Sequence, residues 1–180
     1  FRQEHNLTVI ESKRKMLAKL WTARVRLKSP RSAAELEALV IELSKDARVA
    51  YAEPNYVITG ASVAPDNYAW QWDLARGLAA KSSFSSEVAR TPVIAVVSTG
   101  LDSSSPLSTR FPYDFVDDDR EPTDTVEGKG TLLARAVAAD RENCETCLIM
   151  PVRVINERGF GTTADLAEAL IYAADYDAQV

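Results

Sequence analysis

The sequence predicts a two-part α/β chain, in which a small α+β domain precedes part of a doubly wound parallel sheet. The β-branched apolar run at 93–97 (VIAVV) is typical of a strand buried on both faces. Strands and helices alternate from this run to residue 176, which is the pattern of a parallel sheet with helical crossovers. Residues 7–58 lack that alternation and surround one amphipathic helix, which indicates a separate small domain.

The first domain is predicted to have the element order β-β-α-β. Strands are expected at 7–12 and 20–27, the second with polar and apolar side chains alternating. Extended structure returns at 48–58, where Pro54 introduces an irregularity. Turn-forming residues then mark a linker. The first domain, the linker and the second domain are therefore expected at 1–58, 59–68 and 69–180.

The helix of the first domain is predicted to begin after Ser32 and to end near Asp46. Ser32 and Glu35 form a capping box, in which each side chain satisfies a backbone N–H of the first turn. Four apolar residues then follow at helical spacing and give the helix one apolar face. These residues are Leu36, Leu39, Val40 and Leu43.

The second domain continues from the strand at 93–97 with four further elements. Thr163 is the expected N-cap of the last helix, and Asp165 lies in its first turn. Residues 178–180 read as the beginning of another strand. The four elements are a strand at 113–116, a helix at 130–140, a strand at 148–155 and a helix at 164–176.

Composition and charge exclude two classes of partner. The chain is 46% hydrophobic and 26% charged, with a net charge of −5, which argues against a nucleic-acid partner. No apolar run approaches the roughly 20 residues of a membrane-spanning helix. Residues 1–60 carry 11 basic and 7 acidic side chains, a charge of +4, so residues 61–180 carry −9. Two segments of opposite sign can attract each other, although unrelated surface charge would give the same numbers.

The two cysteines, Cys144 and Cys147, are too few for a disulfide framework. A zinc site needs about four ligands, and the single histidine, His5, is far away in the sequence. A thioredoxin-like pair would follow a strand at a helix N-terminus, whereas this pair precedes a strand. Two unpaired thiols or one local disulfide are therefore expected.

Five segments together resemble the subtilisin-like serine proteases, or subtilases. They occur in that family's order and extend over nearly the whole chain, so coincidence is improbable. Two resemble catalytic motifs of the family, and the others resemble the end of its propeptide, the start of its mature domain, and a later strand and helix. The segments are IAVVSTGLD at 94–102, GKGTLLAR at 128–135, AYAEPNYV at 50–57, YAWQWDL at 68–74, and MPVRV at 150–154 with the helix after Gly161.

The resemblance implies a fold and a role for each domain. Residues 1–58 would be a ferredoxin-like α+β propeptide domain, which assists folding and blocks the substrate cleft with its C-terminal tail, here 53–57 and the residues after them. Residues 69–180 would be the first half of a subtilisin-like doubly wound parallel sheet. The partners implied are a polypeptide substrate or peptide ligand, and the propeptide docked in cis. Secretion is the localisation that the resemblance implies. The chain begins at Phe1 rather than Met, so the lack of a visible signal peptide does not argue against it.

The chain departs from the family at both catalytic positions that it covers. In active subtilases an Asp orients the catalytic His, which takes the proton of the nucleophilic Ser. Here Ser98 stands at the Asp position and Lys129 at the His position, and the nucleophile would lie beyond residue 180. Asp102 lies four residues past Ser98, after the turn, and His5 is in the propeptide-like segment. We therefore expect an inactive protease, which binds a peptide or regulates a partner.

Other hypotheses are kept open. Some serine hydrolases use Lys as the base. Lys129 at a helix N-terminus, where the dipole disfavours positive charge, could serve with Ser98 as its hydrogen-bond partner. The chain would then be a stretch of an active subtilase, or of one inactivated deliberately. A third hypothesis is a scaffold in which the fold serves only as structure. An isolated half-sheet would also expose an apolar edge and be unstable.

None of these hypotheses requires a cofactor, but an acidic loop is a candidate binding site for Ca²⁺. Calcium takes 6–8 oxygen ligands, and thermitase-like subtilases bind it in a similar loop. The candidate ligands are Asp114, Asp117, Asp119 and Glu121. Arg120 in their midst is a departure, and a solvated acidic loop is the alternative.

Overall fold

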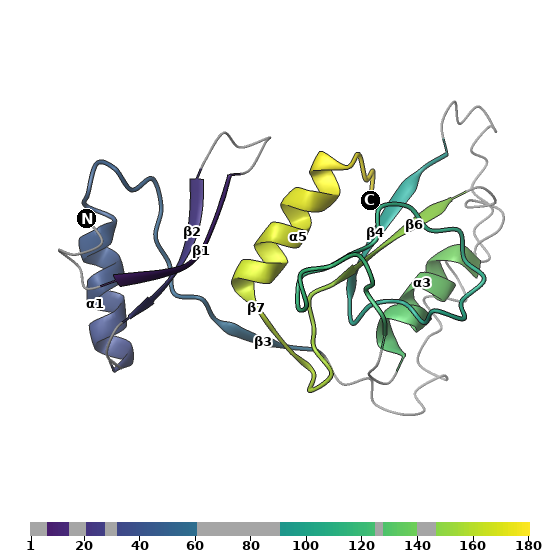
Figure 1. Cartoon of the computed structure of the whole chain (residues 1–180), viewed down its shortest axis with the longest axis horizontal. Coiled ribbons are helices and arrows are strands. Elements are labelled where there is room, and N and C mark those ends of the chain that lie inside the picture. Colours follow the sequence, from purple (N-terminus) through teal and green to yellow (C-terminus); the bar gives the residue numbers. More distant parts are fainter. Residues whose placement is uncertain (1–6, 15–20, 28–31, 61–90, 125–127, 140–146) are drawn as a thin grey trace, which may run out of the picture. The chain divides into compact units, whose positions relative to one another are not determined.

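A computed structural model describes residues 7–14, 21–27, 32–60, 91–124, 128–139 and 147–180 (Figure 1). The chain divides into two compact units, Phe1–Tyr56 and Val57–Val180. The boundary lies two residues before the end predicted for the first domain. This small difference assigns one strand to the second unit.

The first unit contains a two-stranded antiparallel sheet and one helix. Strand β1 (Leu7–Arg14) pairs with β2 (Trp21–Leu27), and helix α1 (Ala33–Leu43) follows. The predicted capping box is confirmed, because Ser32 Oγ accepts from the Glu35 N–H at 3.3 Å and the Glu35 carboxylate accepts from the Ser32 N–H at 2.8 Å. Leu39 and Leu43 are buried and form the core on this side of α1.

The strand that follows α1 belongs to the second unit. Strand β3 is Val57–Thr59, and the described residues from 50 to 56 form no strand. β3 pairs antiparallel with β7 (Phe160–Thr162), which the sequence did not predict. Of the extended segment expected at 48–58, only the end forms a strand, and that strand pairs within the second unit because strand pairing depends on a partner remote in sequence. The ferredoxin-like fold of this unit stays a prediction.

A three-stranded parallel sheet forms the centre of the second unit. Its strands are β4 (Val93–Ser98), β5 (Tyr113–Asp114) and β6 (Leu148–Arg153), in the order β4-β6-β5. In register, Ser98 lies opposite Arg153 on one side, and Asp114 lies opposite Arg153 on the other. Three polar residues therefore end neighbouring strands at one edge of the sheet.

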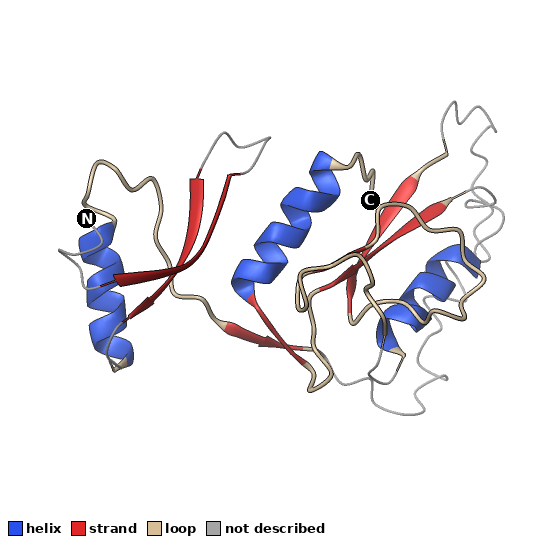
Figure 2. Ribbon diagram, viewed as in Figure 1, coloured by secondary structure: helices blue, strands red, loops and turns tan. Residues whose placement is uncertain are grey.

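Two helices cover opposite faces of this sheet, as expected of a doubly wound arrangement. Figure 1 shows α3 (Lys129–Ala139) and α5 (Thr163–Asp175) on either side of β4 and β6, and Figure 2 shows the same layers by element type. Met150 and Val152 of β6 pack with Ala169 and Ala173 of α5. Alternate residues of a strand point to opposite faces. Ile149 accordingly packs on the other face, with Val96 and Ala134 of α3.

The last helix and the chain end differ from expectation by small shifts. The N-cap of α5 is Thr162 rather than Thr163, and its hydroxyl accepts from the Asp165 N–H at 3.2 Å. Residues 178–180 run along β4, where the Gln179 N–H donates to the Val93 carbonyl at 2.9 Å. In the part of the chain that is described, no helix is long and apolar enough to cross a membrane.

Candidate functional site

The two positions at which the chain departs from the subtilase motifs lie at one edge of the sheet. Ser98 is the last residue of β4, and Lys129 is the first residue of α3. The residues that follow them are in contact, since the Gly130 N–H donates to Thr99 Oγ1 at 2.9 Å. The fold therefore brings the Ser98 and Lys129 positions to the same edge.

Close backbone packing explains the two glycines of this edge. A Cβ on Gly130 would lie 2.0 Å from the Gly100 carbonyl oxygen. A Cβ on Gly100, which has φ +110°, would lie 2.4 Å from the Pro122 carbonyl oxygen. Both separations are far below van der Waals contact. The turn after β4, the segment at 122–124 and the start of α3 can thus approach only through glycine.

Asp124 holds the first turn of α3 and was not singled out from the sequence. Its carboxylate accepts from the Thr131 N–H at 3.0 Å and from the Thr131 hydroxyl at 2.8 Å. The Thr131 oxygen in turn accepts from the Asp102 N–H at 2.9 Å. Free N–H groups at a helix start need such acceptors. An acidic residue five positions before a helix was the only sequence signal.

Asp102 serves the local turn rather than the Ser98–Lys129 edge. Its carboxylate accepts from the Ser104 N–H at 2.8 Å and from the Ser104 hydroxyl at 2.9 Å. These hydrogen bonds, the backbone one first, lower the pKa of Asp102 below its usual value. The expectation that Asp102 does not replace the lost Asp agrees with this geometry.

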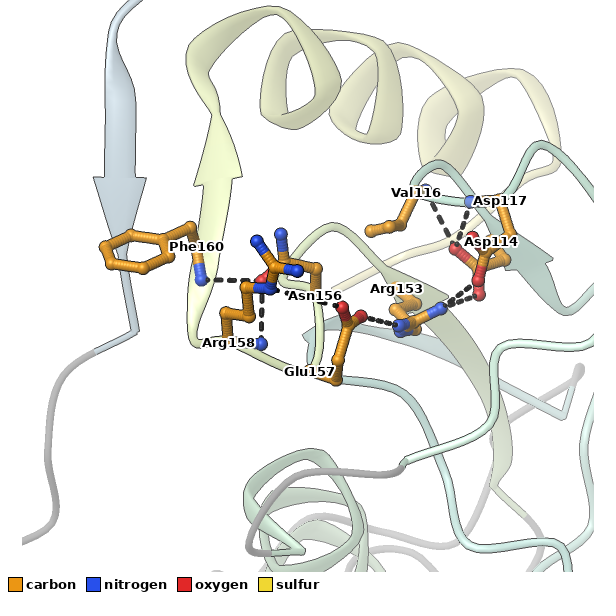
Figure 3. Close-up of polar contacts among 8 residues, drawn as sticks. All are labelled: Asp114, Val116, Asp117, Arg153, Asn156, Glu157, Arg158 and Phe160. Carbon is orange, nitrogen blue, oxygen red and sulfur yellow. Dashed lines mark hydrogen bonds and ion pairs between the residues drawn. The ribbon is translucent and has the colours of Figure 1, made fainter.

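A buried ion pair lies beside this edge. The side chain of Arg153 is 6% exposed and that of Asp114 is 1% exposed, and their Nη1 and Oδ2 atoms are 2.6 Å apart (Figure 3). Asp117 Oδ2 lies 2.6 Å from the same Nη1, and Glu157 Oε2 lies 3.5 Å from Nη2. Burial lowers the pKa of Arg153, but the hydrogen bonds that its guanidinium donates to Asp114 and Asp117 outweigh this effect, so the pKa lies above its usual value. The network links the acidic loop to the residues that follow β6.

The four carboxylates predicted to bind Ca²⁺ do not fit a calcium site in this arrangement. One oxygen of Asp114 accepts from the Val116 and Asp117 N–H groups, and the other accepts from Arg153. The Asp119 carboxylate accepts from the Glu121 N–H at 2.8 Å. Within the described ranges, no three acidic, His or Cys side chains are grouped so that they could hold a metal. The Arg153 guanidinium is already paired with two of the four carboxylates, those of Asp114 and Asp117.

The second candidate site is the β3–β7 ribbon. Val57, Ile58 and Thr59 lie opposite Thr162, Gly161 and Phe160. The Gly60 N–H extends the ladder by donating to the Gly159 carbonyl at 3.0 Å. Ile58 packs against the core formed by β6 and α5. The edge of β7 thus accepts an extended segment, and one apolar side chain of that segment enters the interior.

A tight turn presents β7 to this segment. Asn156 Oδ1 accepts from the Arg158 N–H at 2.9 Å and from the Phe160 N–H at 3.1 Å (Figure 3). The Asn156 N–H donates to the Phe160 carbonyl at 2.8 Å. Gly159 adopts φ +80°, which closes the turn. β7 is therefore held by the turn itself as well as by β3.

Several predictions fall outside the described residues. They concern His5, the aromatic segment at 68–74, most of the predicted linker, and Cys144. Cys147 is disulfide-bonded. This agrees with the local disulfide, one of the two alternatives left open.

Comparison with curated proteins relates this geometry to known enzymes. No family model matches the chain. The chain is 33% identical over 168 residues to the thermophilic serine proteinase of Bacillus sp. (strain AK1), which covers 81% of this chain and 39% of that protein. It is 34% identical over 119 residues to thermitase of Thermoactinomyces vulgaris, covering 61% and 38%. Its homologues are subtilisin-like serine proteases.

A third relative aligns over more residues, although the alignment covers a smaller part of that relative. The cell wall-associated protease of Bacillus subtilis (strain 168) is 31% identical over 175 residues, which is 83% of this chain and 19% of that protein. The chain thus spans less than half the length of these relatives.

Proposed function

We propose that the chain is part of a subtilisin-like protein that has lost proteolytic activity and binds extended peptides. The observation that carries the proposal is the pairing of β3 with the edge of β7. Addition of a strand to an exposed edge is a general mode of peptide recognition, in which main-chain hydrogen bonds give affinity and side-chain pockets give specificity. Here the chain's own residues 57–60 take the place of the ligand.

The loss of activity is supported by the residue types at the edge of the sheet. A hydroxyl at position 98 cannot supply the negative charge that orients an imidazole, and Lys129 has no imidazole. Without cleavage, residues 1–60 stay covalently joined to the rest of the chain. We assign them the role of a retained propeptide whose tail covers the edge of β7, and we place the protein outside the cytoplasm, in line with the cell wall-associated relative.

The test uses the 180-residue chain and a variant with its own strand disrupted. Ile58→Pro places a residue without an N–H donor in the middle of β3. A fluorescent peptide with the sequence of residues 55–62 should bind the variant, as measured by anisotropy. It should bind the unaltered chain at least tenfold more weakly, because a tethered segment competes at millimolar effective concentration. Equal binding to both proteins, or to neither, would refute the proposal that residues 57–60 cover a peptide-binding edge of β7.

A separate assay tests the proposed inactivity. The chain, and the same chain with Ser98→Asp and Lys129→His, are incubated with labelled casein, and their own masses are followed. We expect no casein cleavage and no cut near residues 59–68 in either protein, since the nucleophile of the family lies beyond this sequence. Cleavage by the unaltered chain would contradict the proposal.

The alternative function is that of an active subtilase stretch with Lys129 as the base. It is favoured by the contact between Thr99 and Gly130, which brings the Ser98 and Lys129 positions to one edge. Labelling by a fluorophosphonate at pH 9.5, in a protein that contains this chain with its downstream sequence, would support it. Loss of that labelling in Lys129→Met would be required as well. An unlabelled protein leaves the peptide-binding role.

A further inference from the structure

Phe160 lies where it can select the sequence of the bound segment. It is the first residue of β7, and its side chain remains 46% exposed although β3 pairs beside it. In Figure 3 its ring extends from β7 toward β3. The residue directly opposite is Thr59. An exposed aromatic ring next to a ligand-binding edge is a feature that the proposed function does not yet use.

The register places the pair where side chains approach most closely. Gly60 lies opposite Gly159, and the Gly60 N–H donates to the Gly159 carbonyl at 3.0 Å. Hydrogen-bonded and non-hydrogen-bonded pairs alternate along an antiparallel ladder, so Thr59 and Phe160 form a non-hydrogen-bonded pair. In such pairs the Cα atoms are about 4.5 Å apart and the side chains are in closer contact.

The two faces of the ribbon have different roles. Ile58 turns toward the core, and its partner Gly161 has no side chain there, since a Cβ on Gly161 would lie 2.2 Å from the Val154 carbonyl oxygen. Thr59 and Phe160 lie on the opposite, outward face. Val57, which is 68% exposed, shares this face two residues away. The outward face therefore carries β-branched residues on the ligand strand and an aromatic ring on the receptor strand.

The backbone of Phe160 is held in place by Asn156. The Phe160 N–H donates to the Asn156 side chain at 3.1 Å, and its carbonyl accepts from the Asn156 N–H at 2.8 Å. A strand whose backbone is fixed before the ligand arrives loses less conformational freedom on binding. Pairs of an aromatic with a β-branched residue are favourable in antiparallel ladders, by about 0.2–1 kcal/mol relative to alanine pairs.

We propose that Phe160 is a specificity-determining residue of the peptide-binding edge and selects ligands with a β-branched residue at the position of Thr59. The inference rests on the proposed function, because it assumes that β7 binds extended peptides. The ligand class is an unmodified peptide in extended conformation, with a branched apolar residue at the position of Ile58 and Thr, Val or Ile at the next position.

The test is a double-mutant cycle on the peptide-accepting chain. Peptides of residues 55–62 with Thr, Val or Gly at position 59 are titrated against the Ile58→Pro chain with Phe160 retained, with Phe160→Ser, or with Phe160→Leu. The affinity of the Thr or Val peptide relative to the Gly peptide is the quantity compared. This ratio should be about two- to fivefold larger in the chain with Phe160 than in Phe160→Ser. Phe160→Leu should retain part of this discrimination, because it keeps an apolar side chain.

The outcomes separate the two proposals. If no peptide binds the Ile58→Pro chain, the proposed function fails and the inference fails with it. If peptides bind but the Thr-to-Gly ratio is the same with Phe160 and with Ser, peptide binding stands and the role of Phe160 is refuted. A second readout needs no added peptide: in the chain with β3 intact, Phe160→Ser should speed hydrogen exchange of the Gly60 amide two- to fivefold, and unchanged exchange would also refute the inference.

Discussion

Arg153 shows how one residue connects the elements around the sheet edge. Its guanidinium is bonded to the buried Asp114 and to the more exposed Asp117 and Glu157. Removing one partner of a buried pair leaves the other charge unpaired in a medium of low polarity. Arg153 is also the last residue of β6 and lies opposite Ser98, so its replacement should disturb the candidate site as well.

The first prediction concerns this pair. Arg153→Met should lower the free energy of unfolding by about 3–5 kcal/mol, because the Asp114 carboxylate would remain buried without its partner. Adding Asp114→Leu to Arg153→Met should restore most of the loss. Urea unfolding followed by circular dichroism measures both. Arg158→Met is the matched control, since the Arg158 side chain is 80% exposed and the effect should stay within about 0.5 kcal/mol.

The second prediction concerns Gly130. Gly130→Ala would place a Cβ 2.0 Å from a backbone oxygen of Gly100, which cannot move aside as a side chain can. We expect a destabilisation of at least the roughly 1–3 kcal/mol typical of overpacking. Gly60→Ala is the control, since the nearest atom to a Cβ there is 3.8 Å away. Equal unfolding midpoints for the two variants would contradict the close approach of α3 to the turn after β4.

At the scale of elements, helix α5 is joined to the loop around β5 by aromatic rings. The ring centroids of Tyr172 and Tyr176 are 4.3 Å apart, and those of Phe111 and Tyr176 are 5.0 Å apart. Tyr113 and Phe115 also contact Tyr172. Such pairs stabilise by about 0.5–1.5 kcal/mol beyond their buried area. They hold α5 to the loop on the sheet face opposite α3.

The third prediction is a pH dependence that arises from this cluster. Burial raises the pKa of Tyr172, and the neighbouring Tyr176 raises it further. A tyrosine with a raised folded-state pKa contributes fully below its unfolded pKa of about 10, and this stability is lost as the pH rises through the folded value. The unfolding free energy should therefore fall from about pH 10 upward, and Tyr172→Phe should flatten part of that fall. Tyr56→Phe, at a tyrosine that is 57% exposed, is the control.

At the scale of the whole molecule, the two units differ in what holds them. Among the residues of the first unit whose side chains are described, Leu39 and Leu43 form a core with the partly buried Leu27 and Ala52. The second unit has buried clusters on both faces of its sheet. The second unit is also the larger of the two, with residues 57–180 against 1–56, and a larger unit buries a greater fraction of its surface on folding. The second unit should therefore retain its structure at denaturant concentrations at which the first is unfolded.

The fourth prediction concerns calcium. Since Arg153 occupies the acidic loop and the Asp114 oxygens are already hydrogen-bonded, calorimetric titration with millimolar Ca²⁺ should give no binding heat. EDTA should leave the melting temperature unchanged. In the double variant Arg153→Met with Asp114→Leu, calcium should remain without effect. A calcium-dependent rise in melting temperature would instead support the ligand set read from the sequence.

The sequence by itself determined those elements whose cause is local. The capping box fixes the start of α1 through groups three residues apart, and the apolar run of β4 announces a strand buried on both faces. The alternation of strands and helices predicted the parallel sheet. The motifs around Ser98 and Lys129 also pointed to the relatives that the comparison found.

Only the tertiary structure decided which distant residues meet. β7 is three residues long and carries no periodic pattern, so it becomes a strand only because β3 pairs with it across about a hundred residues. The register of β5 and β6 places Arg153 beside Asp114, which the sequence predicted only as a calcium ligand. Local propensities act over a few residues, whereas such pairings depend on the fold as a whole and leave little trace in the sequence around either partner.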